Sequence, residues 1–308
     1  MSSPSVRIGT RASPMALRQA ELVRDRLAAA HGDFAGGGIE LVPISTTGDR
    51  VLTRRLAEIG GKGLFTKEIE EALIDRRIDL AVHSLKDMET VLPAGLTIGC
   101  VLPRDDPRDA LISRSGAAID ALPPGAVIGT ASLRRRAQLL RRRPDLQVVP
   151  MRGNVGTRLA KLEAGEVDAL VLALCGLARL GQAAAASQIL EPEIMLPAVG
   201  QGALAIECRA ADERVLQLIA PLRDAATTAC VVAERAMLAA LDGSCRTPIA
   251  GLATLAGDNL HLSGLLLSED GNAERRGEIE GKAAEAATLG DRLGRQLRDG
   301  AGQEFGFG

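Results

Sequence analysis

Short apolar runs alternate with amphipathic helical stretches along most of the chain, and this alternation limits the fold more than any other feature of the sequence. The first apolar runs, which we predict to be strands, are Val6–Gly9, Ile39–Ile44, Leu80–Val82 and Leu96–Val101. One helix is expected to follow a capping Ser13, with Pro14 at its first position, and another to cover Phe65–Arg76. The face that the first helix would bury consists of Ala16, Ala20, Val23 and Leu27. Strands that alternate with helices favour a parallel sheet with helices on both faces, so the pattern predicts an α/β domain.

The alternation restarts after Pro103-Arg104-Asp105-Asp106-Pro107, a polar stretch that we interpret as an interdomain hinge. The second series consists of strands at Val127–Thr130, Gln147–Pro150 and Ala169–Leu174 and helices at Ser132–Arg143 and Val155–Ala164. Leu196–Gly202 is interpreted as a second crossing, after which a strand at Ala203–Cys208 would rejoin the first domain. Two α/β domains joined by a double crossover leave a cleft, which is a usual place for a ligand.

The last part of the chain has a different pattern, which predicts a small α+β domain. A helix at Thr227–Leu241 precedes two antiparallel strands, Ile249–Leu255 and Leu260–Leu267, and a closing helix covers Ala283–Arg298. Gly300–Gly308 is expected to fray. The expected domains are residues 1–102 with 200–217, residues 103–199, and residues 218–308.

Composition excludes several classes of protein. A net charge of −2 and the lack of Trp and Tyr disfavour nucleic-acid binding. No stretch has the apolar length of a membrane span, and no basic and apolar secretory signal is visible at the N-terminus. The five cysteines are far apart and form no C-x-x-C pair, which argues against a zinc site or a disulfide framework and favours reduced thiols in a cytoplasm. Each cysteine, taken alone, is most simply an inert buried thiol.

Five polar loops follow predicted strand ends, where α/β proteins place their sites. They are Thr10–Ser13, Gly60–Lys67, His83–Asp87, Gly129–Arg135 and Arg152–Arg158. Taken singly, each loop is a capped turn with solvated charges. Together they favour a cleft that binds a small polyanion, because helix N-termini and arginine forks both attract anions. None has the spacing of a nucleotide-binding P-loop.

Asp87 is the one carboxylate among the cations of these loops, and its neighbours leave three roles open. It could be a counter-ion of Lys86, a general acid or base, or an anion that stabilises a developing positive charge.

Eight stretches together resemble the porphobilinogen deaminase family, from Arg7 to about Leu267. Any one of them is weakly specific, but all eight occur in the family's order and at its spacing. They are Arg7–Leu17 (RIGTRASPMAL), Gly60–Glu70 (GGKGLFTKEIE), Ala81–Asp87 (AVHSLKD), Gly129–Arg135 (GTASLRR), Arg142–Leu146 (RRPDL), Arg152–Leu159 (RGNVGTRL), Leu196–Cys208 (LPAVGQGALAIEC) and Leu241–Ile249 (LDGSCRTPI).

The resemblance implies two similar α/β domains of the periplasmic-binding-protein type, a double crossover hinge and a small C-terminal α+β domain. It implies an enzyme that adds four porphobilinogen units stepwise to a dipyrromethane cofactor, releases ammonia each time, and frees hydroxymethylbilane by hydrolysis. The cofactor would be held by a thioether to Cys245. Each addition passes through a methylene-pyrrolenine cation, whose barrier a nearby anion would lower.

The family's functional positions carry over to residues of this chain one by one. The implied catalytic residues are Asp87, Lys86 and Arg11. The implied cofactor-binding residues are Cys245, Ser13, Lys62, Ser84, Asp87, Thr130, Ser132, Arg134, Arg135, Arg152 and Gly153. The implied substrate-binding residues are Arg11, Arg152, Arg158, Arg179 and Gln201. A cytoplasmic monomer without metal, nucleic acid or membrane partners is expected.

Three positions depart from the family pattern: Met88-Glu89 stands where many members have a proline, Glu58 where some have lysine, and Ala131 where serine is common.

Two other functions suit the same residues, a solute-binding protein and a phosphate-ester or amino-acid enzyme. Ehrlich's reagent separates these alternatives, because it reacts only if a pyrrole cofactor is bound covalently.

Overall fold

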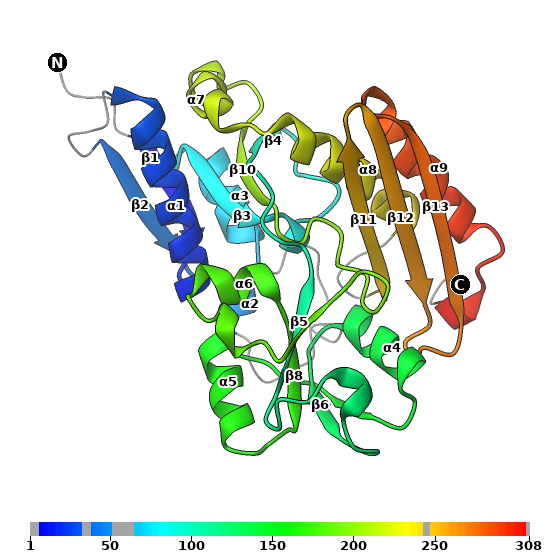
Figure 1. The fold of residues 1–308 in the computed structure, drawn as a ribbon. Helices are drawn as coiled ribbons and strands as arrows, with labels where there is room; N and C mark the ends of the chain where they lie inside the picture. Colours follow the sequence, from blue (N-terminus) through cyan, green and yellow to red (C-terminus); the bar gives the residue numbers. More distant parts are fainter. Residues whose placement is uncertain (1–5, 33–37, 51–64, 243–246, 306–308) are drawn as a thin grey trace. The chain divides into compact units, whose positions relative to one another are not determined.

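The structure is a computed structural model that describes residues 6–32, 38–50, 65–242 and 247–305 (Figure 1). Lys62 and Cys245 lie outside the described residues, as do Gly60–Leu64 of the second polar loop. The chain divides into two compact units, one of Met1–Arg104 with Ala203–Thr228 and one of Asp105–Gly202 with Ala229–Gly308. The domain bounds expected from the sequence stay a prediction.

The first unit contains a five-stranded sheet in the order β2-β1-β3-β10-β4. Its strands are β1 (Val6–Arg11), β2 (Ile39–Ile44), β3 (Leu80–Ser84), β4 (Leu96–Val101) and β10 (Leu204–Arg209). Its helices are α1 (Pro14–Ala30), α2 (Thr47–Arg50), α3 (Lys67–Ile74) and α7 (Glu213–Ile219). Side chains of α1 and α7 form one core with one face of the sheet, and those of α3 form a smaller core that includes Ala81. The expected burial of Ala16, Ala20, Val23 and Leu27 is confirmed.

The second unit repeats this strand order in a second sheet, β7-β6-β8-β5-β9. Its strands are β5 (Asp109–Ser113), β6 (Val127–Gly129), β7 (Gln147–Val149), β8 (Ala169–Ala173) and β9 (Gln188–Leu190). Its helices are α4 (Leu133–Arg142), α5 (Val155–Glu163) and α6 (Leu174–Arg179). The sequence predicted neither β5, β9 nor α6.

Both sheets are mixed, so the prediction of parallel sheets is correct only in part. β1 pairs in parallel with β2 and β3, and β6 with β7 and β8. β10 runs antiparallel to β3 and β4, and β5 runs antiparallel to β8 and β9. These two strands follow the crossings directly, so each enters its sheet from the other unit and not through a crossover helix, which is the connection that makes neighbouring strands parallel.

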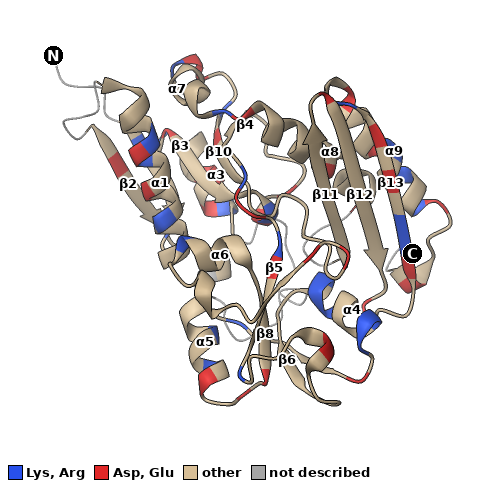
Figure 2. Ribbon diagram, viewed as in Figure 1, with Lys and Arg blue, Asp and Glu red and all other residues tan. Residues whose placement is uncertain are grey.

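The third sheet consists of β11 (Ile249–Ala256), β12 (Asn259–Leu267) and β13 (Glu274–Lys282), all antiparallel, with α8 (Ala225–Ala240) and α9 (Ala286–Arg298). Strand β13 was not predicted, because it is mostly charged (Figure 2) and exposes most of its side chains. The expected fraying of the C-terminal segment is wrong for Phe305, which ends a short 3-10 turn (Gln303–Phe305) and is buried in this core. The three sheets confirm the predicted fold class of two similar α/β domains and a small α+β domain.

The third sheet packs against α4 inside the second unit. Ala137 of α4 shares a buried cluster with Ala250 and Leu265. Gly271, at φ +78°, comes so close that a Cβ atom there would lie 2.5 Å from the carbonyl oxygen of Ala137. Only glycine fits this turn without displacing α4.

Among the described residues, no single helix is long and apolar enough to cross a membrane, although the bent pair Glu213–Leu222 and Ala225–Ala240 passes by length and composition alone.

Candidate functional site

In the first unit, β1 and β3 are parallel neighbours and end at the same edge of the sheet. Ser13 begins α1 there as the expected N-cap, and its Oγ accepts a hydrogen bond of 3.3 Å from the backbone N–H of Ala16. Arg11 ends β1, and its Cζ lies 4.3 Å from the centroid of the Phe65 ring, an arrangement typical of a cation–π contact. This edge therefore presents a helix N-terminus beside a guanidinium.

Strand β3 leads directly into the turn that carries Lys86 and Asp87. Ser84 ends the strand, and its Oγ accepts a hydrogen bond of 2.9 Å from Nε2 of Gln19 on α1. The backbone N–H of Leu85 donates to the carbonyl of Ala203, at 3.0 Å. Lys86 and Asp87 are both half-buried in the 3-10 turn Leu85–Asp87. The turn is thus fixed to α1 on one side and to the entry of β10 on the other.

Asp87 carries a carboxylate that is not neutralised within the described part of the chain. It accepts no hydrogen bond there and forms no ion pair, in particular none with its neighbour Lys86. The role of a counter-ion of Lys86 is therefore not supported by the structure. A half-buried carboxylate without a cation is available to a positively charged ligand.

A buried group of ionisable side chains lies just before this turn, and the sequence did not predict it. His83 Nε2 lies 3.0 Å from Oε2 of Glu207 on β10, and both side chains are buried. Burial raises the pKa of Glu70 on α3, and the charge of Glu207 adds to that shift, while Thr66 opposes it through a hydrogen bond.

In the second unit, two helices begin at polar loops that the sequence singled out. Ser132 caps α4 with its Oγ, and its own backbone N–H donates to Oγ1 of the buried Thr130, at 3.3 Å. Asn154 caps α5 and accepts from the backbone N–H of Thr157, at 2.8 Å. Gly153 precedes this cap at φ +118°, which favours glycine. Both N-termini carry the partial positive charge of the helix dipole.

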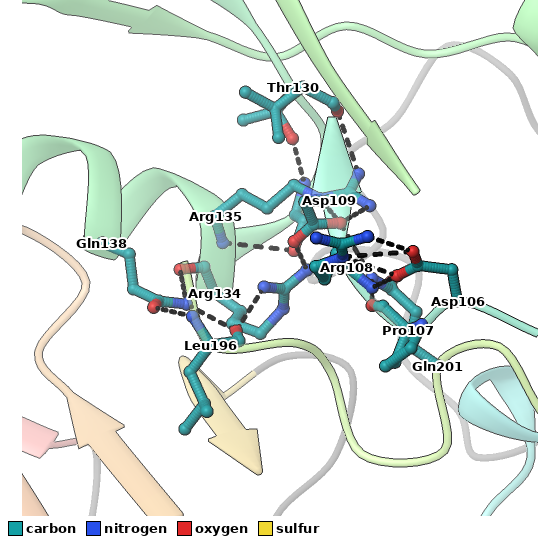
Figure 3. Close-up of polar contacts among 12 residues, drawn as sticks. Asp106, Pro107, Arg108, Asp109, Thr130, Arg134, Arg135, Gln138, Leu196 and Gln201 are labelled. Carbon is teal, nitrogen blue, oxygen red and sulfur yellow. Dashed lines mark hydrogen bonds and ion pairs between the residues drawn. The ribbon is translucent and has the colours of Figure 1, made fainter. Parts of the chain in front are cut away.

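Asp109, the first residue of β5, joins three of the predicted ligand-binding side chains (Figure 3). Its carboxylate is fully buried and accepts from Nη2 of Arg134 and Nη2 of Arg135, each at 2.8 Å. Gln201 Nε2 donates to the same carboxylate at 2.8 Å. Burial raises the pKa of Asp109, but the two guanidiniums outweigh this effect and hold the pKa well below its usual range.

The remaining donors of the two arginines are mostly used inside the protein. Nη1 of Arg134 donates to the carbonyl of Leu196 at 2.7 Å, and Nη1 of Arg135 donates to that of Val171 at 3.0 Å. The buried Nε of Arg134 is left without a partner among the described residues.

Arg158 on α5 is the clearest sign of an anion site. The side chain is half-buried, and its Nε donates to the carbonyl of Gly153 at 2.8 Å. Burial, together with the charges of Arg135 and Arg152, lowers the pKa of Arg158 to about 10. Arg135 is paired with Asp109, whereas Arg158 forms no ion pair with any described residue. A half-buried guanidinium without a carboxylate partner favours an anionic ligand.

Arg179, at the end of α6, forms an ion pair with Asp105 and donates from Nη2 to the carbonyl of Gly202, at 2.9 Å. Gln201 also donates to the carbonyl of Pro107, at 2.7 Å. Both predicted substrate-binding side chains therefore contact the chain crossings.

The four cysteines in the described part of the chain are shielded from reaction by burial. Cys100, Cys175, Cys208 and Cys230 are all buried, and none forms a disulfide bond with another described residue. Burial raises the pKa of Cys100 and that of Cys208 to about 11. A thiol with such a pKa is almost entirely protonated at neutral pH.

Asp109 is the main site residue that the sequence analysis missed. The signal was present, because an aspartate directly before the apolar run Ala110–Ile112 is unusual unless it is paired. Nothing in the sequence identified Arg134 and Arg135 as its partners, since they are 25 and 26 residues away along the chain.

Replacing Asp109 by asparagine is expected to lower the free energy of unfolding at neutral pH by about 3–5 kcal/mol, because two buried guanidiniums lose their counter-charge. The folded-state pKa is lowered, so the carboxylate stabilises the fold above its unfolded pKa, and this contribution is lost as the pH falls. The difference between the two proteins should therefore shrink below about pH 4. Urea denaturation of both proteins at several pH values measures this difference in the free energy of unfolding.

Asp120→Asn is the matched control, because Asp120 pairs with Arg142 at an exposed position and should contribute less than about 1 kcal/mol. Equal destabilisation by the two substitutions would contradict the assigned role of Asp109.

The chain matches two family models and two curated relatives over most of its length. The model "Porphobilinogen deaminase, dipyromethane cofactor binding domain" matches residues 6–217, and "Porphobilinogen deaminase, C-terminal domain" matches residues 228–299. A porphobilinogen deaminase of Paracoccus denitrificans is 55% identical over 300 residues, which are 97% of this chain and 96% of that protein. Another, of Syntrophotalea carbinolica, is 51% identical over 297 residues, which are 96% of this chain and 93% of that protein.

Solved structures show a weaker likeness. A TRAP periplasmic solute binding protein from Desulfovibrio salexigens has a TM-score of 0.44 and 12% identity, with 72% of this chain and 73% of that chain covered.

Proposed function

This chain belongs to the porphobilinogen deaminase family, and from that premise we propose which of its residues carry out the family's reaction. The protein is an enzyme that condenses porphobilinogen stepwise, with release of ammonia, into the linear tetrapyrrole hydroxymethylbilane. Its cofactor is a dipyrromethane. When bound, the cofactor supplies the pyrrole carbon to which the first substrate molecule is joined.

The side chains of the second unit suit a ligand with many carboxylates, which is what a chain of acetate- and propionate-bearing pyrroles is. Arg158 is half-buried, forms no ion pair with any described residue, and is affected by the charges of Arg135 and Arg152. An arginine fork binds a carboxylate through two parallel hydrogen bonds. We assign Arg152 and Arg158 to direct binding of carboxylates. Arg134 and Arg135 are assigned to the same site through their positive charge, because their donors are directed at Asp109 and at backbone carbonyls.

Thr130, Ser132 and Gly153 belong to the same assignment as parts of the two helix N-termini. In the first unit, Arg11, Ser13 and Ser84 are assigned to ligand carboxylates at the shared edge of β1 and β3. Lys62 is assigned to the cofactor on the family match alone, because it lies outside the described residues.

Asp87 is assigned to the reacting atoms. In each cycle the aminomethyl group of the substrate loses ammonia, a carbon–carbon bond forms, and one proton leaves the attacking pyrrole carbon. Positive charge develops on the substrate pyrrole as the C–N bond breaks. A carboxylate that no cation of the described residues neutralises can stabilise that charge and hold the released proton. Lys86 and Arg11 are assigned to the leaving amine and the substrate carboxylates.

Cys245 is assigned as the attachment point of the cofactor. The support is that the other four cysteines are all buried, and that two of them have raised pKa values. The absence of disulfide bonds among these four cysteines is also typical of a reducing compartment, so we place the enzyme in the cytoplasm. That it acts as a monomer stays a prediction.

The observation that carries the anion-binding assignment is that the half-buried Arg158 forms no ion pair with any described residue, and Arg158→Leu tests it. The loss of a charge-assisted hydrogen bond to a substrate carboxylate is expected to lower kcat/KM roughly 10- to 100-fold. Stalled covalent complexes should accumulate, and native gels and intact-mass spectra separate them.

The substitution should affect stability differently in the two forms of the protein. In the form without cofactor, Arg158→Leu relieves repulsion with Arg135 and Arg152, so the free energy of unfolding should not fall. In the form with cofactor, the substitution removes a contact with the ligand, so the free energy of unfolding should fall. Arg142→Leu, at an exposed position paired with Asp120, is the control. Elongation by Arg158→Leu at the parent rate would refute the anion-site assignment.

A further inference from the structure

The guanidinium of Arg179 connects both places where the chain passes between its two units. Its Nε donates to Oδ2 of Asp105 at 2.8 Å, and its Nη2 donates to the carbonyl of Gly202 at 2.9 Å. The backbone N–H of Asp105 donates to the same carbonyl, at 3.2 Å. Asp105 begins the second unit, and Gly202 is its last residue before the chain returns to the first. Three groups therefore form a closed triangle at the crossings.

The triangle fixes an otherwise flexible side chain. An arginine side chain loses rotamer entropy when it is immobilised, and a guanidinium that is already held in place loses less of it on binding a ligand. Two of the three nitrogens of Arg179 are held by Asp105 and Gly202. Gly202 has φ +90°, a conformation that favours glycine and that sets the direction of its carbonyl.

We propose that Asp105 is a positioning residue for the reaction: it holds the Arg179 guanidinium in the orientation in which Arg179 binds a substrate carboxylate. This inference rests on the proposed function, which assigns Arg179 to the substrate. Asp105 itself is assigned no contact with the substrate or the cofactor.

The opposite relation is physically reasonable and gives the opposite result. An aspartate paired with an arginine can compete with the substrate carboxylate for the same donors. Removing a competitor lowers KM, whereas removing a positioning group raises it.

Asp105→Asn tests the proposal, because 45% of the Asp105 side chain is exposed and asparagine keeps the backbone hydrogen bond to Gly202. An exposed ion pair is worth up to about 1 kcal/mol, so we expect KM for porphobilinogen to rise by roughly three- to fivefold with kcat changed less than about twofold. The matched control is Asp106→Asn at the adjacent residue, which pairs with Arg108 and is exposed to a similar degree. It should leave KM within about 1.5-fold of the parent value.

A double-substitution cycle shows whether Asp105 acts through Arg179. Arg179→Gln should raise KM by roughly tenfold, and adding Asp105→Asn to it should raise KM no further. Additive effects, an unchanged KM or a lower KM in Asp105→Asn would each overturn the proposal.

The same cycle separates failure of this inference from failure of the proposed function. If Arg179→Gln raises KM and Asp105→Asn does not, only the positioning role is wrong. If Arg179→Gln leaves KM unchanged, the assignment of Arg179 to the substrate is wrong, and the positioning role is refuted with it.

Discussion

Asp87→Asn is expected to give a folded protein that carries its cofactor and turns over roughly 100- to 1,000-fold more slowly than the parent, which corresponds to about 3–4 kcal/mol of barrier. Asparagine keeps the shape of the side chain but removes the charge. Because the described residues supply Asp87 with no ion pair, its charge is available to the cation that forms as ammonia leaves. Single-turnover rates with porphobilinogen measure the chemical step, and Ehrlich's reagent checks that the cofactor is present.

Glu89→Gln is the matched control for this prediction. Glu89 is two residues further along, is half-buried like Asp87, and is assigned no part in the reaction. Its neutralisation should change turnover less than about threefold, since a charge outside the reacting centre acts only at long range. If the two variants are slowed equally, the field of the whole loop matters and Asp87 has no special role. Near-normal turnover in Asp87→Asn would refute the catalytic assignment outright.

Local signals in the sequence predicted much of the fold. Ser13 and Ser132 were expected at helix N-termini, and both cap the helices that follow them. Ile39–Ile44 and Leu96–Val101 have the bounds that their apolar runs predicted. Such features depend on a few neighbouring residues, so a single sequence contains the information needed.

Pairing between distant segments was harder to predict. The direction of β10 in its sheet depends on a chain that leaves the first unit and returns about 100 residues later, and no local pattern records it. Strand β13 was missed because charged residues make up one face, while the other face has two glycines, Arg275 and a single apolar side chain, Ile279, which leaves little apolar alternation. Phe305 follows a glycine-rich stretch that is typical of a frayed end, yet one aromatic ring suffices to anchor it.

The candidate site shows the same division. Residue types and loops could be predicted, and the family resemblance supplied their roles. The counter-charges could not be predicted, because Asp105 and Asp109 form their ion pairs with arginines that are distant along the chain. As a result the arginines, which are equivalent in the sequence, differ in the structure. Arg134 and Arg135 are buried and paired with Asp109, whereas Arg158 has a pKa that is lowered by burial and by two other guanidiniums.

Cys245→Ser is expected to remove both the covalently bound cofactor and nearly all activity. A serine hydroxyl is far less nucleophilic than a thiolate at neutral pH, so the thioether cannot form. The intact mass of the parent should exceed the sequence mass by two porphobilinogen units less the ammonia lost on condensation. In the variant this excess should be absent. The folded variant should also unfold at a lower temperature, because the native state loses a ligand that the unfolded state does not bind in the same way.

The position of the extra mass decides between Cys245 and the other thiols. Tryptic cleavage after Arg235 and Arg246 gives a peptide with Cys245 as its single cysteine, and the whole excess should lie on it. Cys175→Ala is the control, because Cys175 is buried and should keep the excess mass on the same peptide. For Cys100 and Cys208, pKa values of about 11 leave far less than one thiol in a thousand ionised at pH 7, so attachment there would require the protein to unfold first. An unmodified mass in active enzyme, or an excess on a peptide with Cys100, Cys175, Cys208 or Cys230, would refute the assignment of Cys245.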